Sequence, residues 1–238
     1  MIKLENYEVM GWKHAIRGMR NPMNSWEKSD SYFNLDCDNI SCEDCPTRGR
    51  SDCVRALDMQ KSNIGPNDHD LMMRLRNAGT DHRKFMRMIT VYVDITAPLY
   101  WWKEFDTYKV GTTVSSCSTM HKIHEKEFTM GDFSYEYLDD MSLDALERVI
   151  NILNYNRRCY NDITGKDQTT AKHFWWQMIQ LLPSSYNQKR TVMLNYEVLA
   201  NIYKSRKNHK LTEWVELCKW IEEKLPYSEL ITGKKEVN

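Results

Sequence analysis

Two polar side chains near the C-terminal end of the sequence are spaced to bind one extended ligand. The positions i, i+4, i+7 and i+11 of one segment are Asn195, Leu199, Ile202 and Arg206. A helix would place all four on one face, with the two polar ends about 16 Å apart at a rise of about 1.5 Å per residue. An amide at one end and a guanidinium at the other suit a ligand with hydrogen-bonding groups and a distal phosphate. The alternative is an ordinary helix that ends in a solvated arginine.

Four cysteines in a short polar segment could bind a metal ion: Cys37, Cys42, Cys45 and Cys53. The Cys-x-x-Cys step lets two thiolates chelate one tetrahedral ion, and four soft ligands suit zinc or an iron–sulfur cluster. The surrounding segment, about 34–66, has few apolar residues, so a structural metal, zinc first, would explain how it becomes ordered. The alternative is a flexible loop with free thiols.

Other reactive side chains have simpler explanations. Cys117 lies in a Thr/Ser-rich stretch and could be a nucleophile, although a lone cysteine is more often inert packing. His121 and His124 are three residues apart, but their charged neighbours indicate a solvated segment rather than a ligand pair. His209 follows Arg206 closely and either contacts the same phosphate or marks a helix boundary.

The elements that position these side chains follow from hydrophobic spacing. Residues 88–95 are dense in β-branched and aromatic side chains and predict a strand. Thr96 then reads as the N-cap of an aromatic helix that has Pro98 in its first turn. Upstream, the spacing predicts a helix over 68–77 that Gly79 ends.

The C-terminal half is predicted to be mainly helical. Ser142 reads as the N-cap of a long apolar-faced helix, and a break follows at 182–185. Two further helices are expected over about 190–205 and 210–224, while the stretch from 111 to 119 reads as a loop. The N-terminal residues 1–31 indicate a short strand or helix followed by a polar loop.

The length of 238 residues suits one large domain or two small ones, and we expect a single domain, 1–238, that carries the Cys-rich insertion. The 33 basic and 33 acidic residues cancel, which argues against nucleic acid as a partner. No stretch approaches the roughly 18–20 apolar residues of a membrane span, and the N-terminus lacks the features of a secretion signal. We therefore expect a cytoplasmic protein without membrane association and, with seven cysteines, no disulfide framework.

The order of residues in the last third of the chain resembles the flavin-dependent thymidylate synthases. In that family a Leu-Pro pair precedes a helix of the form Asn-x-x-x-Leu-x-Asn, and then an Arg and a further helix follow. The matching residues are Leu182-Pro183, Asn195, Leu199, Asn201 and Arg206, with Glu213-Trp214 just beyond. The resemblance implies that Asn195 and Asn201 border the flavin and that Arg206 binds the phosphate of deoxyuridylate (dUMP). The family's Arg between the two asparagines is Glu197 here.

The resemblance extends more loosely to residue 68. The family has a helix, a nearby His, a strand and a Pro-led aromatic helix, and the predicted elements and His82 follow this order. The family's next motif, Arg-His-Arg-x-x-Ser-x-Asn-x-x-Ser-x-Arg, falls on 107–119, where Lys109 and polar character are kept. The resemblance implies that His82 and Lys109 bind the flavin and that Ser116 and Ser118 bind the substrate.

The resemblance also implies a fold and a reaction. The fold is α+β, with a central, mostly antiparallel sheet packed with helices. The reaction is the FAD-dependent methylation of dUMP to dTMP by a homotetramer, with methylenetetrahydrofolate as carbon donor and NADPH as reductant. Such chemistry needs positioning and electrostatics rather than a protein nucleophile. Two alternatives remain: a nucleotide-binding or pyrimidine-nucleotide-modifying protein of this fold without the usual flavin reaction, and a chain whose Cys-rich segment binds a partner protein.

Overall fold

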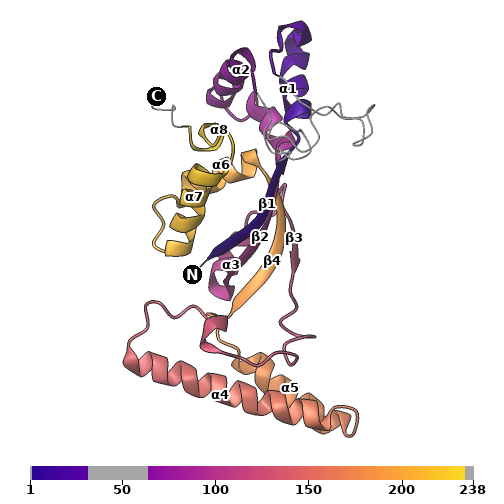
Figure 1. The fold of residues 1–238 in the computed structure, drawn as a ribbon, viewed down its shortest axis with the longest axis vertical. Helices are drawn as coiled ribbons and strands as arrows, with labels where there is room; N and C mark the ends of the chain where they lie inside the picture. Colours follow the sequence, from indigo (N-terminus) through magenta and orange to yellow (C-terminus); the bar gives the residue numbers. More distant parts are fainter. Residues whose placement is uncertain (1, 32–63, 234–238) are drawn as a thin grey trace, which may run out of the picture.

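A four-stranded sheet forms the centre of the protein. The structure is a computed structural model, and it describes residues 2–31 and 64–233. The strands are β1 (Lys3–Met10), β2 (Thr90–Pro98), β3 (Thr113–Ser116) and β4 (Asn187–Asn195), in the order β1-β2-β4-β3. Each neighbouring pair is antiparallel, and helices lie around the sheet (Figure 1). The predicted α+β fold with a mostly antiparallel sheet is confirmed.

The central strand β2 shows why these residues form a sheet. Val91, Val93 and Ile95 are buried on one face, whereas Tyr92 points to the other, exposed face. The predicted strand is therefore confirmed, but it continues to Pro98. The expected N-cap role of Thr96 is wrong, because β4 runs far enough to pair with the last three residues of β2 and α3 begins only after Pro98.

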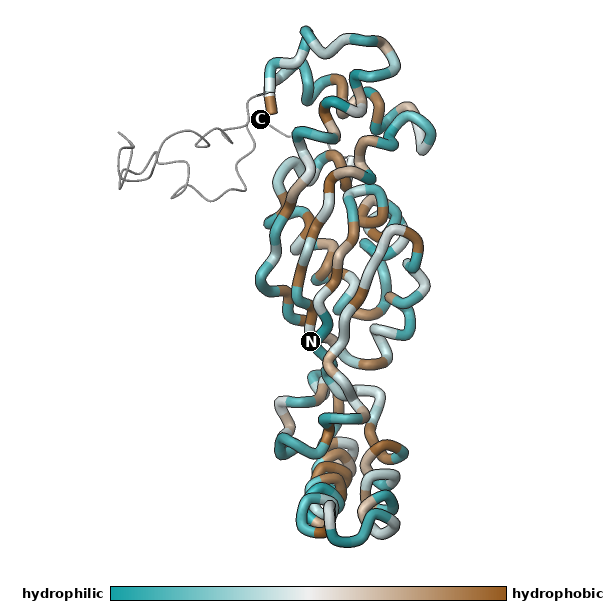
Figure 2. The backbone as a smooth tube through the Cα atoms, turned by 90° about the vertical axis from the view of Figure 1, so that its right-hand side faces the viewer, coloured by the Kyte–Doolittle hydropathy of each residue, from teal (hydrophilic) through white to brown (hydrophobic). Residues whose placement is uncertain are grey.

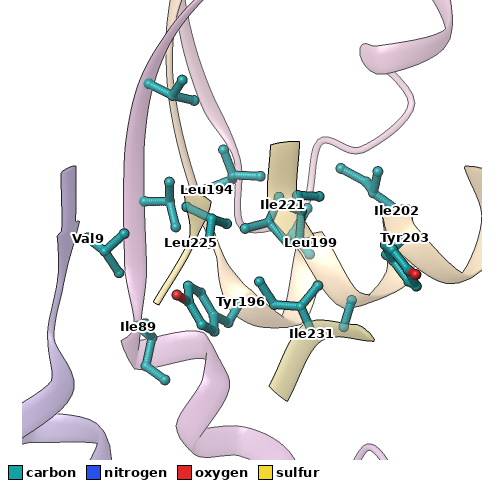
Figure 3. Packing of buried hydrophobic residues seen from close by; sticks show 14 of the residues in the cluster. Val9, Ile89, Leu194, Tyr196, Leu199, Ile202, Tyr203, Ile221, Leu225 and Ile231 are labelled. Carbon is teal, nitrogen blue, oxygen red and sulfur yellow. The ribbon is translucent and has the colours of Figure 1, made fainter. Parts of the chain in front are cut away.

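Three helices cover the buried face of the sheet: α3 (Leu99–Phe105), α6 (Tyr196–Arg206) and α7 (Thr212–Lys224). Figure 3 shows Leu199 and Ile202 of α6 within the apolar cluster that also contains Ile221 and Leu225. The side chains of Leu199 and Ile202 are 1% and 0% exposed. The middle of the helical face that the sequence suggested for a ligand is thus part of the hydrophobic core.

The helix expected over 190–205 begins later than predicted. Residues 190–195 belong to β4, where Val192 and Leu194 alternate into the core with a period of two. The helix α6 follows directly, because the Asn195 side chain accepts a hydrogen bond of 3.1 Å from the Val198 backbone nitrogen and caps the helix. No loop separates the strand from the helix, so the sequence has no glycine, proline or polar run there that would mark the boundary.

The stretch 111–119, expected as a loop, contains the edge strand β3. Thr113 and Val114 pair with Met193 and Val192 of β4. The expectation was wrong because this strand is short, polar and exposed on one side, which is common at a sheet edge.

Two antiparallel helices, α4 (Asp140–Ile163) and α5 (Gln168–Leu181), form one end of the elongated molecule (Figure 1). They enclose a second apolar cluster, which includes Ile150, Leu153 and Met178, and Figure 2 shows these hydrophobic stretches in brown apart from those of the sheet. The long helix predicted after Ser142 is confirmed but begins earlier, because Asp139 is the N-cap and accepts a hydrogen bond of 2.9 Å from the Ser142 nitrogen.

The opposite end contains the remaining helices and most of the 3-10 turns: α1 (Trp12–Arg20), α2 (Pro66–Asn77), α8 (Glu229–Thr232), η1 (Asn21–Met23), η2 (Trp26–Lys28) and η3 (Arg83–Met88). The helix predicted over 68–77 is confirmed as α2. The last 3-10 turn, η4 (Met130–Asp132), lies near α4. No helix within the described residues is long and apolar enough to cross a membrane.

A buried cluster of hydrogen bonds joins the two ends of the Cys-rich insertion. The Arg20 Nε donates to Asp68 Oδ1 at 2.6 Å, and Asp68 Oδ2 accepts from the Ser31 hydroxyl at 2.6 Å. The Gly65 nitrogen also donates to Ser31 Oγ at 3.0 Å. Arg20 and Asp68 are almost completely buried, so the chain on both sides of the insertion is fixed at one place.

Candidate functional site

The loop 106–112 lies along α6 and contacts both of its ends. Near the C-terminal end, Arg206 Nε donates to the Tyr108 hydroxyl at 3.0 Å. Near the N-terminal end, Gly111 approaches Asn195 so closely that a Cβ on Gly111 would lie 2.9 Å from Asn195 Nδ2. Gly111 has φ +76°, a conformation that favours glycine. The loop therefore bridges the amide and the guanidinium that the sequence suggested for one ligand.

Arg206 is held between aromatic rings and one carboxylate. Its Cζ lies 4.8 Å from the ring centroid of Trp214 and 5.8 Å from that of Tyr108. Its Nη1 donates to Glu104 Oε2 at 2.8 Å, and the Trp214 indole nitrogen donates to the same oxygen at 2.9 Å. The side chain of Arg206 is only 19% exposed. The guanidinium is thus fixed in orientation and paired with Glu104.

His209 lies at a helix boundary and against Arg206. Its Nδ1 accepts a hydrogen bond of 3.2 Å from the Leu211 nitrogen, just before α7 begins. A neutral ring accepts at only one of its nitrogens, so this bond alternates with the one that the Arg206 guanidinium, which can only donate, makes to Nε2. That nitrogen lies 2.9 Å from Arg206 Nη1 and 3.6 Å from Glu104 Oε2. His209 therefore marks a helix boundary and also lies against the arginine.

A pocket of about 280 Å³ adjoins the Arg206 cluster. It is lined by Phe105, Asp106, Tyr108, Lys109, Thr112 and Val114. Thr112 Oγ1 is buried and has no hydrogen-bond partner within the part of the chain that the structure describes. A buried hydroxyl without a partner is costly, so this oxygen is available to a ligand. The pocket thus combines an aromatic wall, an ammonium group and an unpaired hydroxyl.

Arg190 adds a second guanidinium beside this pocket. Its Nη1 donates to Asp106 Oδ1 at 2.9 Å, its Nε donates to Gln188 Oε1 at 2.9 Å, and its Cζ lies 4.2 Å from the Trp102 ring centroid. The sequence analysis missed this residue. The sequence pattern that could have revealed it is the alternation of buried residues along β4. This alternation places Arg190 on the inward face between Gln188 and Val192, where an arginine is unusual.

The remaining flavin-binding candidates gather near η3 rather than in the pocket. Asn201 is exposed and its Oδ1 accepts from Arg83 Nη2 at 3.4 Å. Arg83 also donates to Glu197 Oε1 at 3.0 Å, and Glu197 is 6% exposed. His82 is exposed and directly precedes Arg83 as the N-cap of η3. In the resembled family an arginine lies between the two asparagines, at the position of Glu197 on α6. Here the guanidinium beside Asn201 comes from Arg83 of η3 instead.

The two serine candidates lie at the far side of β3. Ser116 is exposed and pairs in register with Arg190. The Ser118 hydroxyl accepts from the backbone nitrogens of Met120 and His121 at 3.2 and 2.9 Å. Within residues 64–233, no hydrogen bond joins either serine to Arg206, and Ser116 lies in register with the second guanidinium instead.

The cysteines and histidines outside this site add little chemistry. Cys37, Cys42, Cys45 and Cys53 lie outside the described residues. Elsewhere in the described chain, no three His, Cys, Asp or Glu side chains are arranged as metal ligands. Cys117 is exposed, and its backbone is fixed to β4 by a 2.9 Å hydrogen bond from its nitrogen to the Lys189 oxygen.

A half-buried tyrosine, Tyr100, supports the Arg206 cluster. Burial, and then the neighbouring Glu213 carboxylate, raises the pKa of Tyr100 well above its usual value. The Tyr100 hydroxyl therefore stays protonated and donates to Glu213, next to Trp214 in the sequence. This contact fixes α7 against α3 rather than moving a proton.

An antiparallel sheet covered by helices on one face is also the architecture of several solved structures. A solved flavin-dependent thymidylate synthase, ThyX from Helicobacter pylori complexed with FAD and dUMP, is similar with 15% identity and a TM-score of 0.58, over 97% of this chain and 96% of that chain. A second structure of the H. pylori protein gives 16% identity and a TM-score of 0.57, over 97% and 95% of the two chains.

A third similar structure is the UMP/dUMP methylase PolB from Streptomyces cacaoi bound with 5-Br dUMP. It has 10% identity and a TM-score of 0.52, over 93% of this chain and 88% of that chain. No family model matches the sequence, and a search of curated proteins finds no match. At these identities the three structures establish the shared fold.

Proposed function

We propose that the protein binds the phosphate of a pyrimidine nucleotide at Arg206 and methylates its base, converting dUMP to dTMP in a flavin-dependent reaction. The observation that carries this proposal is the placement of Arg206 between Trp214 and Tyr108 at the edge of a pocket. The similar structures of the same fold that contain FAD with dUMP, or 5-Br dUMP, support the choice of ligand.

The residues of one chain fit a nucleotide better than a whole dinucleotide. Small-molecule pockets usually measure about 300–1,000 Å³. At about 280 Å³, this pocket can take one phosphate or ring portion of FAD, with Lys109 and Thr112 as the polar partners. When bound, the reduced flavin supplies hydride, while methylenetetrahydrofolate provides the carbon and NADPH the electrons. The side chains of this chain orient the nucleotide and balance its charge.

The small pocket also favours an oligomer. In the proposal, a second copy of the chain covers the parts of a bound FAD that extend beyond this pocket. We therefore retain a homotetramer in the proposal. Light scattering coupled to gel filtration measures the mass directly, and a monomer at all concentrations would contradict this part.

An absorption spectrum tests the central claim. The purified protein is mixed with FAD, with and without dUMP, and passed through gel filtration. Bands near about 450 nm that elute with the protein are expected, followed by dTMP formation when methylenetetrahydrofolate and NADPH are added. The absence of retained flavin at saturating FAD and dUMP would contradict the flavin-dependent reaction.

A second candidate function is nucleotide binding without the flavin reaction. The contact of Glu197 with Arg83 favours it, because this pair occupies the neighbourhood of Asn201 and engages its side chain. In this case dUMP binds with an affinity that depends on Arg206, while FAD binds neither alone nor with the nucleotide. The zinc site at the four cysteines stays a separate proposal, which metal analysis of the purified protein tests.

A further inference from the structure

One oxygen atom of Glu104 accepts from the donors that a ligand phosphate would use. Glu104 Oε2 lies 2.8 Å from Arg206 Nη1 and 2.9 Å from the Trp214 indole nitrogen. His209 Nε2 lies 3.6 Å from the same oxygen. A guanidinium and an indole N–H that converge on one point form an anion site, and the carboxylate of Glu104 fills it.

The donors stay in place without Glu104. The Tyr108 hydroxyl accepts from Arg206 Nε, and the rings of Trp214 and Tyr108 flank the guanidinium. Trp214 is completely buried among the aromatic side chains of α3. These contacts do not involve the carboxylate, so its departure would leave the donors oriented.

Glu104 is more exposed than the two basic side chains beside it. Its side chain is 36% exposed, against 19% for both Arg206 and His209. It lies in the last turn of α3, directly before the loop that lines the pocket. The carboxylate can therefore turn into solvent by a side-chain rotation, whereas the buried donors cannot follow it.

We propose that Glu104 is an internal competitor for the phosphate, and that ligand binding displaces it from Arg206 and Trp214. The inference rests on the phosphate-binding role proposed for Arg206. Two anions within hydrogen-bonding distance of the same donors repel each other, so phosphate and carboxylate exclude one another. The displaced site adds the Trp214 indole N–H to the phosphate contacts, and Glu104 sets the affinity and acts as a positioning residue.

Calorimetry with inorganic phosphate and with dUMP tests this competition. The variants are Glu104→Gln, which keeps an oxygen for the Trp214 indole but has no charge, and Asp70→Asn, which removes a charge from an exposed pair on α2. We expect Glu104→Gln to bind both ligands about fivefold more tightly than the wild type, since a part-exposed ion pair no longer has to break. Asp70→Asn should bind as the wild type does.

A double variant shows whether the gain depends on the arginine. When Arg206→Gln is combined with Glu104→Gln, the second change should no longer tighten phosphate binding. If Glu104→Gln does not fold, Glu104→Asp replaces it. This side chain keeps the charge but is one methylene shorter and withdraws from Arg206, so it should also tighten binding. Equal or weaker phosphate binding by the folded variant, or no binding at all, would overturn the inference.

The two ligands separate this inference from the proposed function. Tighter binding of inorganic phosphate by Glu104→Gln, with no affinity for dUMP in any variant, supports the competition and contradicts the pyrimidine-nucleotide proposal. Binding of dUMP that is equal in the wild type and in Glu104→Gln, with dTMP formed, supports the proposed function and overturns the competition.

Discussion

The Tyr108 hydroxyl accepts a hydrogen bond of 3.0 Å from Arg206 Nε, although 98 positions separate the two residues in the sequence. This bond fastens the loop after α3 to the C-terminal end of α6. Tyr108 also lines the pocket, so the same side chain orients the guanidinium and forms the wall next to it. The pocket and the arginine are consequently one site.

The substitution Arg206→Lys should weaken dUMP binding at least about tenfold. Lysine keeps the positive charge but loses the planar fork that donates to Tyr108 and Glu104 and stacks on Trp214. Calorimetry gives the dissociation constant, and Arg74→Lys on the exposed side of α2 is the matched control. An unchanged affinity in Arg206→Lys would exclude a bidentate phosphate contact.

The substitution Gly111→Ala should destabilise the loop and weaken ligand binding. The positive φ of Gly111 alone costs an alanine about 1–2 kcal/mol, and the new methyl group would also press on Asn195 Nδ2. Gly165→Ala is the control, because Gly165 has φ +87° but nothing within 4 Å of an added Cβ. Urea unfolding should show a larger loss for Gly111→Ala than for the control. Equal losses would mean that the Asn195 contact has no energetic weight.

The substitution Asp68→Asn should lower the free energy of unfolding by about 3–5 kcal/mol. It removes the charge that balances Arg20 in the core, where both side chains are 5% exposed or less. Asp70→Asn disrupts only the exposed pair with Arg74 and should cost less than about 1 kcal/mol. Urea denaturation of both variants measures the difference. A comparably small loss in each would show that the buried Arg20–Asp68 pair does not stabilise the fold.

Acid should destabilise the protein partly through Asp94. Hydrogen bonds from Thr191, then Asn6 and Lys189, lower the pKa of Asp94 to about 2. Because this value lies below the unfolded value of about 3.9, the stabilisation is complete above about pH 4 and is lost as the pH falls toward 2. Asp94→Asn should therefore lose less stability than the wild type between pH 4 and pH 2. Parallel pH profiles in urea unfolding would contradict this assignment.

Two cysteines should differ strongly in their reactivity. Burial, with a smaller effect of Glu222, raises the pKa of Cys218 to about 11, whereas Cys117 is exposed. At pH 8, alkylation of Cys218 should be about 100-fold slower than that of Cys117, since the thiolate is the reactive form. Mass spectrometry of digested samples follows each site separately. Comparable rates would show that the core around α7 opens readily.

Local signals in the sequence were sufficient for the elements that have clear ends. The β-branched run at 88–95 predicted β2, and the apolar spacing before Gly79 predicted α2. They were insufficient where one element follows another without a break. Asn195 ends β4 and caps α6 at once, so the helical spacing after it gives no sign that residues 190–195 are a strand.

The candidate site was only partly accessible from the sequence. Arg206 could be named because a charged residue ends an apolar helical face, and Lys109 because the resemblance marks its position. Glu104 could not be named, since its partner Arg206 is 102 positions away and only the packing of α3 against α6 and α7 joins them. For the same reason the pairing of Arg83 with Glu197 could not be foreseen.

The hydrogen bond between Ser31 and Gly65 has a practical consequence for engineering. Because Ser31 and Gly65 lie within hydrogen-bonding distance of each other, any segment that links them needs only ends that lie close together. The cost of closing a loop grows slowly with its length, so a short glycine–serine bridge or an entire guest protein could be grafted there. The position between Ser31 and Gly65 is thus a natural attachment point for a fluorescent reporter.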